Sequence, residues 1–187
     1  MRFRELRFND MDFILSIRAS NPDALRTPYL LTLEQQQDWY RNVVCNRSFN
    51  AKYWAIEQEI SFPSVGFGDA SKNQIVMIGY GGIQSIEWEN RRGEMSLLLD
   101  QRCTVAERRE AALETLYHGF NYMNLNNIYT EDYECNDEFS IWYDFAYELG
   151  AYVTGIPNTK FLDGKYYNSM FANFEKRTFM DCVELLS

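Results

Sequence analysis

Apolar side chains recur along this chain with two spacings, which divide it into strands and helices. Alternation of apolar and polar residues, as in residues 3–8, is typical of a half-buried strand, whereas a spacing near 3.6 is typical of an amphipathic helix. Strands are expected at residues 3–8, 53–57, 74–83, 94–99, 127–133, 158–162 and 165–173. Asp163 and Gly164 separate the last two segments and predict a two-residue hairpin turn.

Helices are expected between these strands, at residues 11–19, 33–43, 106–123 and 137–149. Thr32 and Gln35 have the spacing of a capping box, in which each side chain satisfies the backbone amide of the other residue. Gly150 predicts the end of the last helix, because glycine tolerates the left-handed conformation found there. This order of elements predicts an α+β fold with one mixed, mostly antiparallel sheet of six or seven strands.

Length and composition favour one packed domain. A chain of 187 residues can bury a single sufficient core, so residues 1–187 are expected to form one domain. Its 13 Tyr, 13 Phe and 4 Trp supply large apolar surfaces for that core. Residues 61–73, which contain Gly, Ser and Pro, form the loop expected to be most mobile or variable.

Charge and residue types exclude several classes of partner. A formal net charge of -9 argues against sequence-independent nucleic-acid binding, because neutralising phosphates requires a surplus of Lys and Arg. No apolar run approaches the roughly 18 residues that cross a bilayer, so we expect a cytoplasmic protein without a membrane partner. Four widely spaced cysteines and the single histidine, His118, predict reduced thiols, no metal site and a structural role for His118.

Residues 94–113 carry the most information about chemistry. They run from an apolar strand through a short polar turn into an amphipathic helix. The first amides of a helix lack intrahelical partners and carry the positive end of its dipole. The sequence therefore predicts an anion site at this turn, suited to a phosphate-bearing cofactor.

Four strings stand in a characteristic order along the chain: residues 25–40, residues 78–83 with 89–94, residues 125–129, and residues 155–167. Together with the order of the elements, they resemble the GNAT superfamily of acyl-CoA-dependent N-acetyltransferases, in particular its RimJ/RimL and amino-sugar acetyltransferase branch. The resemblance spans nearly the whole chain. It implies a GNAT-like fold in which two central parallel strands splay apart and leave a V-shaped cleft.

The resemblance also implies acetyl-CoA as the cosubstrate. Backbone groups near Leu97, Leu98 and Leu99 would pair with the pantetheine arm as if it were another strand. Amides of the following turn would hold the pyrophosphate. The family pattern N-x-x-A-x-x-L-Y aligns on residues 136–143, which makes Asn136 a further cofactor-binding candidate.

The pyrophosphate turn departs from the family. The usual loop reads Q/R-x-x-G-x-G/A, whose glycines let the backbone approach phosphate oxygens, whereas this turn has no glycine. An ungapped alignment places the loop on residues 104–109. A shifted register places it on residues 101–106, keeps Gln101 and Ala106, and puts Thr104 where the first glycine would stand.

Thr104 and Glu107 also have capping-box spacing, which competes with anion binding, because the Glu107 carboxylate would lie where phosphate charge is expected. Arg102, Arg108 and Arg109 could compensate through charge-assisted bonds to phosphate. The alternative interpretation is an ordinary capped helix with solvated arginines.

Two residues are candidates for the chemistry. By alignment Tyr143 inherits the role of the acid that protonates the leaving thiolate, although counting back from Gly150 places Ala146 at that position. Glu94 aligns with a glutamate that takes the proton of the amine, with pairing to Arg91 or Arg92 as the alternative role.

Polar and aromatic residues supply the remaining candidates. Ser96 on the central strand could bind the substrate or a water molecule. Tyr29 and Tyr80 are candidates for binding the acceptor with their aromatic faces, as is Trp39, for which core packing is the alternative. Cys103 has no evident base to activate it and is not expected to act as a nucleophile.

The sequence therefore predicts direct transfer of an acetyl group from acetyl-CoA to a small amine, an amino sugar or a protein N-terminus. A homodimer is among the expectations. The alternatives are a GNAT-like domain without acetyltransferase activity that serves as a binding or interaction protein, and an acyltransferase with another donor. Such a donor would be an acyl carrier protein or an aminoacyl-tRNA, although the net charge of -9 argues against tRNA.

Overall fold

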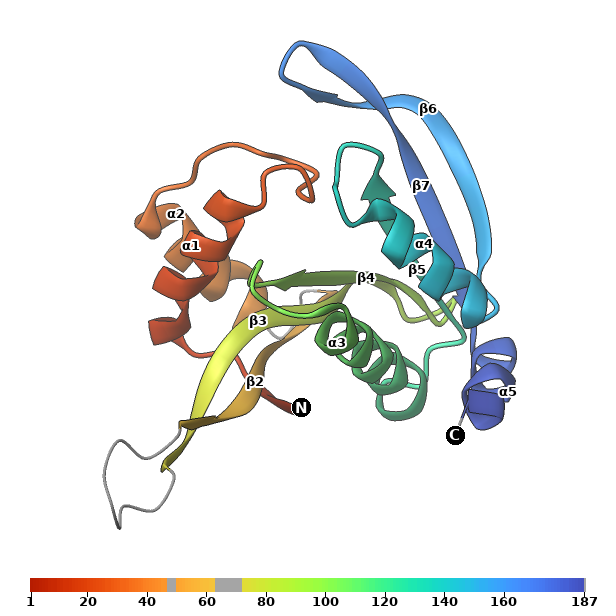
Figure 1. Ribbon diagram of the computed structural model, residues 1–187, viewed down its shortest axis with the longest axis horizontal. Coiled ribbons are helices and arrows are strands. Elements are labelled where there is room, and N and C mark those ends of the chain that lie inside the picture. Colours follow the sequence, from red (N-terminus) through yellow and green to blue (C-terminus); the bar gives the residue numbers. More distant parts are fainter. Residues whose placement is uncertain (47–49, 63–71, 187) are drawn as a thin grey trace.

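The computed structural model describes residues 1–46, 50–62 and 72–186, which form one mixed seven-stranded sheet with helices on both faces (Figure 1). The strand order across the sheet is β1-β2-β3-β4-β5-β7-β6. The strands are β1 (Arg2–Glu5), β2 (Lys52–Phe62), β3 (Lys72–Glu87), β4 (Arg92–Leu99), β5 (Asn127–Tyr133), β6 (Tyr152–Leu162) and β7 (Lys165–Glu175). Neighbouring strands are antiparallel except β4 and β5, which are parallel.

The helices of the described residues are α1 (Met11–Ser20), α2 (Leu33–Trp39), α3 (Val105–Tyr117), α4 (Phe139–Glu148) and α5 (Lys176–Leu186). The chain continues beyond α2 and α3 as π-helical turns at Tyr40–Val44 and His118–Tyr122. Thr32 and Gln35 form the predicted capping box at the start of α2. None of these helices combines the length and the apolarity needed to span a bilayer.

The structure confirms the predicted α+β fold and corrects several of its details. α5 was not predicted, and the helix expected at residues 106–123 changes to a π-helical turn at His118. β3 and β6 are longer than their apolar patterns indicated. Of the loop expected at residues 61–73, residues 63–71 lie outside the described residues.

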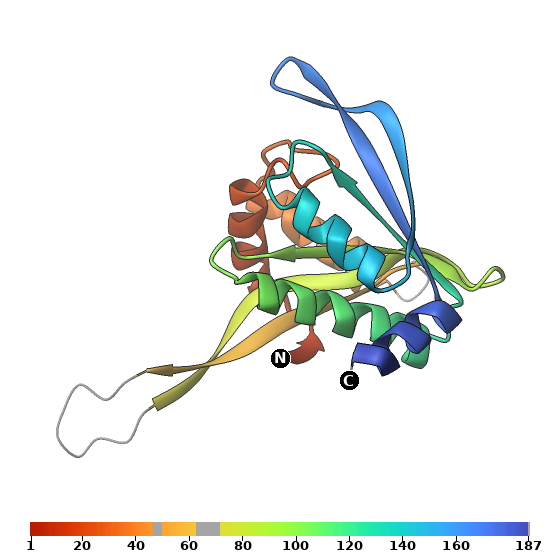
Figure 2. The same cartoon turned by 45° about the vertical axis from the view of Figure 1, so that its right-hand side comes forward.

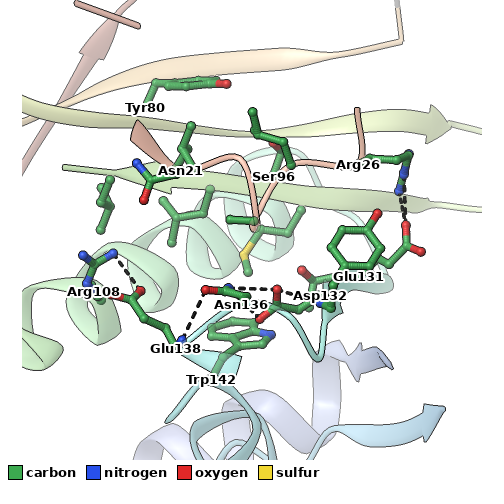
Figure 3. Close-up of a pocket in the computed structure, with 18 of the residues that line it drawn as sticks. Asn21, Arg26, Tyr80, Ser96, Arg108, Glu131, Asp132, Asn136, Glu138 and Trp142 are labelled. Atoms are coloured by element: carbon green, nitrogen blue, oxygen red, sulfur yellow. Dashed lines mark hydrogen bonds and ion pairs between the residues drawn. The ribbon is translucent and has the colours of Figure 1, made fainter. Parts of the chain in front are cut away.

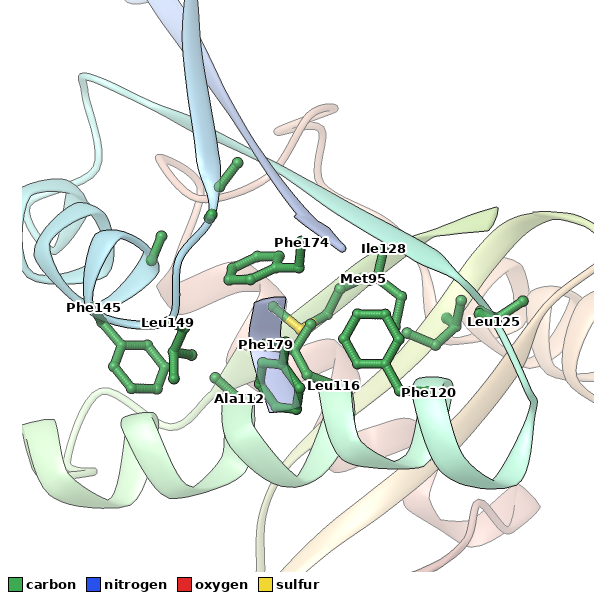
Figure 4. Close-up of a cluster of buried hydrophobic side chains, with 14 of the residues drawn as sticks. Met95, Ala112, Leu116, Phe120, Leu125, Ile128, Phe145, Leu149, Phe174 and Phe179 are labelled. Carbon is green, nitrogen blue, oxygen red and sulfur yellow. The ribbon is translucent and has the colours of Figure 1, made fainter. Parts of the chain in front are cut away.

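The two faces of the sheet carry separate sets of helices. On one face α1 and α2 pack over Ala55, Tyr80 and Leu98. On the other face α3, α4 and α5 enclose the largest buried cluster (Figure 4). Its fully buried side chains include Leu116, Phe120, Leu125, Ile128, Leu149, Phe174 and Phe179. The far ends of β2 and β3, and the β6–β7 hairpin, extend beyond these helices in different directions (Figure 2).

The central strands β4 and β5 part soon after they meet. Their pairing runs only from Arg92 opposite Asn127 to Glu94 opposite Tyr129. The base of this V is held by Arg91, whose carbonyl accepts hydrogen bonds from the Asn126 and Asn127 amides at 2.6 and 3.2 Å. β4 then continues to Leu99 along β3, while β5 continues to Tyr133 along β7. The splayed pair implied by the sequence resemblance is therefore present.

Phe179 provides a test of how α5 is joined to the core. Its ring is 1% exposed and lies 5.1 Å from the ring of Phe120, centroid to centroid. Phe179→Ala should lower the free energy of unfolding by about 3–5 kcal/mol, measured by urea titration, because the deletion removes buried apolar surface and leaves a cavity. Phe161→Ala is the matched control, since Phe161 is 57% exposed and its loss should cost less than about 1 kcal/mol. Equal effects of the two variants would contradict this packing of α5.

Candidate active site

A cleft of ≈ 380 Å³ opens where β4 and β5 part (Figure 3). The residues that line it come from β2, β3, β4 and β5, from α1, α2 and the segment between them, and from α3, α4 and the turn before α4. They include predicted site residues from every group, namely Glu94, Ser96, Leu97, Leu98, Leu99, Tyr80, Arg108, Arg109 and Asn136. The predicted residues that do not line the cleft are Tyr29, Gln101, Arg102, Thr104, Ala106 and Tyr143.

Alternation along the strands sorts the polar residues of the cleft onto two sides. Glu94 lies four residues from Leu98, whose side chain packs against α1 and α2, so both project toward those helices. On β5, Ile128 belongs to the core under α3 and α4, and Asp132 shares its parity. Glu131 has the opposite parity and faces the α1 and α2 side together with Glu94.

Glu94 and Glu131 share one cation, Arg26, from the segment between α1 and α2. Arg26 Nη2 donates to Glu94 Oε1 at 2.5 Å and to Glu131 Oε2 at 2.7 Å. The Glu94 and Glu131 side chains are only 7% and 12% exposed. The sequence-based expectation that Glu94 pairs with Arg91 or Arg92 is therefore wrong in its partner, since Arg91 binds Asn124 and Arg92 pairs with Glu87. Sequence alone could not identify a partner 68 residues away.

A second polar network lies on the α4 side of the cleft. The Asn136 amide donates to both carboxylate oxygens of Asp132, at 3.0 and 3.2 Å, and the Tyr133 backbone amide donates to Asp132 Oδ1 at 2.8 Å. Burial nevertheless raises the pKa of Asp132 to about 6, with contributions from Glu138 and Glu131, against the lowering effect of these donors. Asp132 was not among the predicted residues, and its position at the end of a central strand was the only signal for it.

The turn before α3 forms the predicted capping box. Thr104 Oγ1 accepts a hydrogen bond from the Glu107 amide at 3.3 Å, and Glu107 Oε2 accepts one from the Thr104 amide at 2.7 Å. This second bond, with a further one from Gln58, lowers the pKa of Glu107. Within the described residues, the amides of Val105 and Ala106 have no hydrogen-bond acceptor. Two amides at the helix start therefore remain available.

The three arginines near this turn have different roles. Arg102 pairs with Asp100, its side chain is 88% exposed, and it does not line the cleft. Arg108 donates to the carbonyls of Asp100 and Cys103, both at 3.1 Å, and pairs with Glu138 at 2.9 Å. Arg109 pairs with Glu148 and lies over the Phe145 ring. All three have carboxylate partners, and only Arg108 and Arg109 face the cleft.

Tyr143 lies on α4 between the rings of Phe139 and Tyr147. Its hydroxyl is buried and has no hydrogen-bond partner among the described residues, and burial raises its pKa. Trp142 lines the cleft in its place. Ala146, the alternative from downstream spacing, is 1% exposed and belongs to the core.

Other tyrosines do reach the cleft. Tyr53 and Tyr133 line it, although neither was a predicted site residue, and burial raises the pKa of both hydroxyls. Tyr80 also lines it and accepts a hydrogen bond from Arg18 at 3.3 Å. Tyr29, by contrast, is 70% exposed outside the cleft.

The remaining candidates have structural surroundings. Trp39 lines the cleft and packs against the buried cluster under α1 and α2, so its packing role is present and acceptor binding stays a prediction. His118 stacks on Phe3 and does not line the cleft. Burial raises the pKa of the Cys103 thiol, which disfavours the thiolate that a nucleophile would need.

The titration of Asp132 tests the α4 network. Carbon NMR of the carboxyl groups should give Asp132 a pKa of about 6, against an ordinary 3.8, because burial disfavours the charged form. Asn136→Ala should raise this pKa further, since it removes donors that favour the carboxylate. Because the folded pKa is raised, the wild type should lose stability relative to Asp132→Asn as the pH rises from about 4 to about 6.

Asp100 is the internal control for that titration. Its hydrogen bond from the Arg102 side chain lowers its pKa to about 2. An Asp132 signal that titrates near 3.8, or that does not respond to Asn136→Ala, would contradict the network.

Comparison with known proteins places this fold. No family model matches the chain, and no curated protein matches it. A mutant of the spermidine N-acetyltransferase SpeG from Vibrio cholerae has a similar structure, with a TM-score of 0.76 and 16% identity, covering 97% of this chain and 98% of that chain. The same enzyme in complex with CoA and spermine gives a TM-score of 0.73 and 18% identity, covering 96% and 97%.

A dodecameric structure of that enzyme, in an intermediate state, gives a TM-score of 0.69 and 14% identity, covering 96% of each chain. At these identities the likeness concerns the fold. The chain thus has the fold of an N-acetyltransferase over nearly its whole length, in agreement with the predicted GNAT-like architecture.

Proposed function

We propose that this protein is an N-acetyltransferase that moves the acetyl group of acetyl-CoA to a primary amine, with polyamines as the substrate class. The observation that carries the proposal is the parting of β4 from β5 after Glu94. It exposes one edge of β4 in a cleft that runs between the start of α3 and the Glu94–Glu131 pair. A fold shared with an enzyme that binds CoA and spermine supports the assignment.

The chain's own groups fit acetyl-CoA along this edge. From residue 95 to residue 99, β4 has no partner strand on its β5 side in the described part of the chain. Backbone groups near Leu97 and Leu99 would hold the pantetheine arm by strand addition. The free amides of Val105 and Ala106 would face the pyrophosphate, and Arg109 would add positive charge.

The acceptor would enter from the opposite side of the sheet, where α1 and α2 pack. Glu94 and Glu131 are carboxylates of low exposure on that side, and they bind a cationic group in this structure. A polyamine brings both the reacting amine and a second ammonium group, which suits two carboxylates. Amino sugars and protein N-termini, the other predicted acceptors, carry one cationic amine each.

The proposed chemistry is direct transfer. Glu94 takes one proton from the acceptor ammonium, and the neutral nitrogen then forms a bond to the acetyl carbonyl carbon while the carbon–sulfur bond breaks. After this bond forms, the nitrogen loses one more proton. The departing CoA thiolate takes up one proton, so the protons balance. Tyr143 is the proposed donor of that proton because of its position in the sequence resemblance, and burial keeps its hydroxyl protonated. Tyr133 is the alternative donor, because it lines the cleft whereas Tyr143 does not.

A second candidate function follows from the turn before α3. Because the capping box engages the Thr104 and Glu107 amides, and because glycine is absent, the turn offers fewer groups to a pyrophosphate than the family pattern does. A GNAT-like binding or interaction protein without acetyl transfer would have such a turn. The predicted RimJ/RimL or amino-sugar branch and the predicted homodimer stay predictions.

Acetyl-CoA binding separates these two functions. At 100 times its dissociation constant, the cofactor should stabilise the protein by about 2.7 kcal/mol, seen as a rise in the melting temperature. With spermidine added, free CoA should then appear, and titration of its thiol would measure it. An acetyl thioester that lacks the pyrophosphate is the control for binding at the turn. Absence of a melting shift at millimolar acetyl-CoA would favour the non-catalytic domain.

Two tyrosine variants test the proton donor. Tyr143→Phe should lower kcat by about 10²-fold and change its pH profile, because the leaving thiolate loses its acid. Tyr147→Phe is the matched control, since this neighbour on α4 is 61% exposed whereas the Tyr143 hydroxyl is buried. Unchanged turnover of Tyr143→Phe across pH, with a loss in Tyr133→Phe instead, would move the role to the tyrosine that lines the cleft.

A further inference from the structure

The acceptor side of the cleft already holds a cation that belongs to the protein. Arg26 bonds one carboxylate from each central strand, Glu94 of β4 and Glu131 of β5. Figure 3 shows its contact with Glu131. Its Nε makes a further bond to Glu131 Oε2 at 2.9 Å. The pair therefore binds a planar cation at the point where the acceptor nitrogen has to arrive.

We propose that Arg26 is a tethered competitor of the acceptor amine, whose guanidinium occupies the ammonium subsite of Glu94 and Glu131 until a substrate displaces it. The proposal rests on the proposed function in taking a primary amine as the ligand. It adds Glu131 as a residue of the ammonium subsite, and it gives Arg26 the role of regulating access to Glu94.

The exposure of the three side chains supports exchange. The Arg26 side chain is 53% exposed, whereas those of Glu94 and Glu131 are 7% and 12% exposed. Two carboxylates of low exposure are costly without a cation, because neither water nor another charge compensates them. The carboxylates are thus the fixed part of the subsite, and the cation is the part that can leave toward solvent.

Within the described residues, the backbone of the segment that carries Arg26 is hydrogen-bonded before Arg26 and not between residues 26 and 31. Before Arg26, the Leu25 carbonyl accepts a hydrogen bond from the buried Lys160 ammonium, and the Asp23 carbonyl lies 3.6 Å from Cys135 Sγ. After Arg26, Tyr29 and Leu30 are 70% and 87% exposed. Arg26 can therefore withdraw by rotation of its own side chain, while the backbone stays anchored.

Guanidinium and ammonium groups differ in a way that suits a competitor. Arginine stays protonated at every working pH and is no nucleophile, so Arg26 occupies the subsite without being acetylated. A primary ammonium can give its proton to Glu94 and become reactive. If Arg26 occupies the subsite about nine-tenths of the time, the apparent amine affinity falls by about 10-fold.

Calorimetry of spermine binding without acetyl-CoA tests the proposal. Arg26→Gln should bind spermine about 10-fold more tightly than the wild type, and Arg26→Lys, which keeps the charge, should stay within about 3-fold. Arg41→Gln is the matched control, because Arg41 also has a 53% exposed side chain in an ion pair and lies outside the cleft. Equal or weaker binding by Arg26→Gln would overturn the proposal.

The wild type gives an independent readout that needs no variant. Spermine should increase the rate at which phenylglyoxal modifies Arg26, followed by mass spectrometry, since the displaced guanidinium becomes accessible. Protection of Arg26 by spermine would overturn the proposal, because it would show that both cations stay in the site.

The two proposals fail in different ways. If acetyl-CoA binds while spermine binds neither the wild type nor Arg26→Gln, the competitor and the polyamine class are both wrong and cofactor binding stands. If acetyl-CoA does not bind while Arg26→Gln binds spermine more tightly than the wild type, the subsite stands and the transferase is wrong.

Discussion

The separation of β4 from β5 is the constraint on which the rest of this structure depends. Continued pairing would satisfy the backbone groups of both strands, so the parting has to be imposed from outside the pair. β3 and β7 do so, because each holds its neighbour over nearly the full length of that strand. The Arg91 carbonyl fixes the base of the V through its hydrogen bonds to the Asn126 and Asn127 amides. The hydrophobic core packs on the face of the sheet that α3 and α4 cover.

This parting also decides where the charges of the cleft can lie. Residues of opposite parity on β5 face opposite sides of the sheet, so that Glu131 meets Arg26 while Asp132 meets Asn136. Two carboxylates adjacent in sequence thereby acquire different surroundings. One is neutralised by a guanidinium, and the other is held by amide donors and has a raised pKa.

The sequence predicted what depends on local patterns. The β5 boundaries, the capping boxes at Thr32 and Thr104, and the Asp163–Gly164 turn all follow from neighbouring residues, and both turn residues have the positive φ that such a turn requires. α5 was missed although Phe179, Met180 and Val183 have the spacing of an amphipathic helix, and all three pack against the core under α3 and α4.

The site was predictable along the central strand and, in part, outside it, since the predicted Tyr80, Arg108, Arg109 and Asn136 also line the cleft. Leu97, Leu98, Leu99, Glu94 and Ser96 follow from the position of β4, and the structure places them in the cleft. The bond between Arg26 and Glu131 spans 105 residues of chain, and the raised pKa of Asp132 depends on its burial, and no local spacing encodes either of them. Tyr143 was assigned by alignment, and a shift of one residue on α4 suffices to turn Trp142 toward the cleft instead.

Arg108 gives the glycine-free turn a property that flexible loops lack. Arg108 donates hydrogen bonds to the carbonyls of Asp100 and Cys103 and pairs with Glu138. These contacts fix the backbone between β4 and α3 before any ligand binds. A glycine-rich loop loses conformational entropy when it closes on an anion, whereas this turn is already ordered and loses little. The smaller entropy cost of binding to a rigid turn can thus offset the loss of the phosphate contacts that glycines would have allowed.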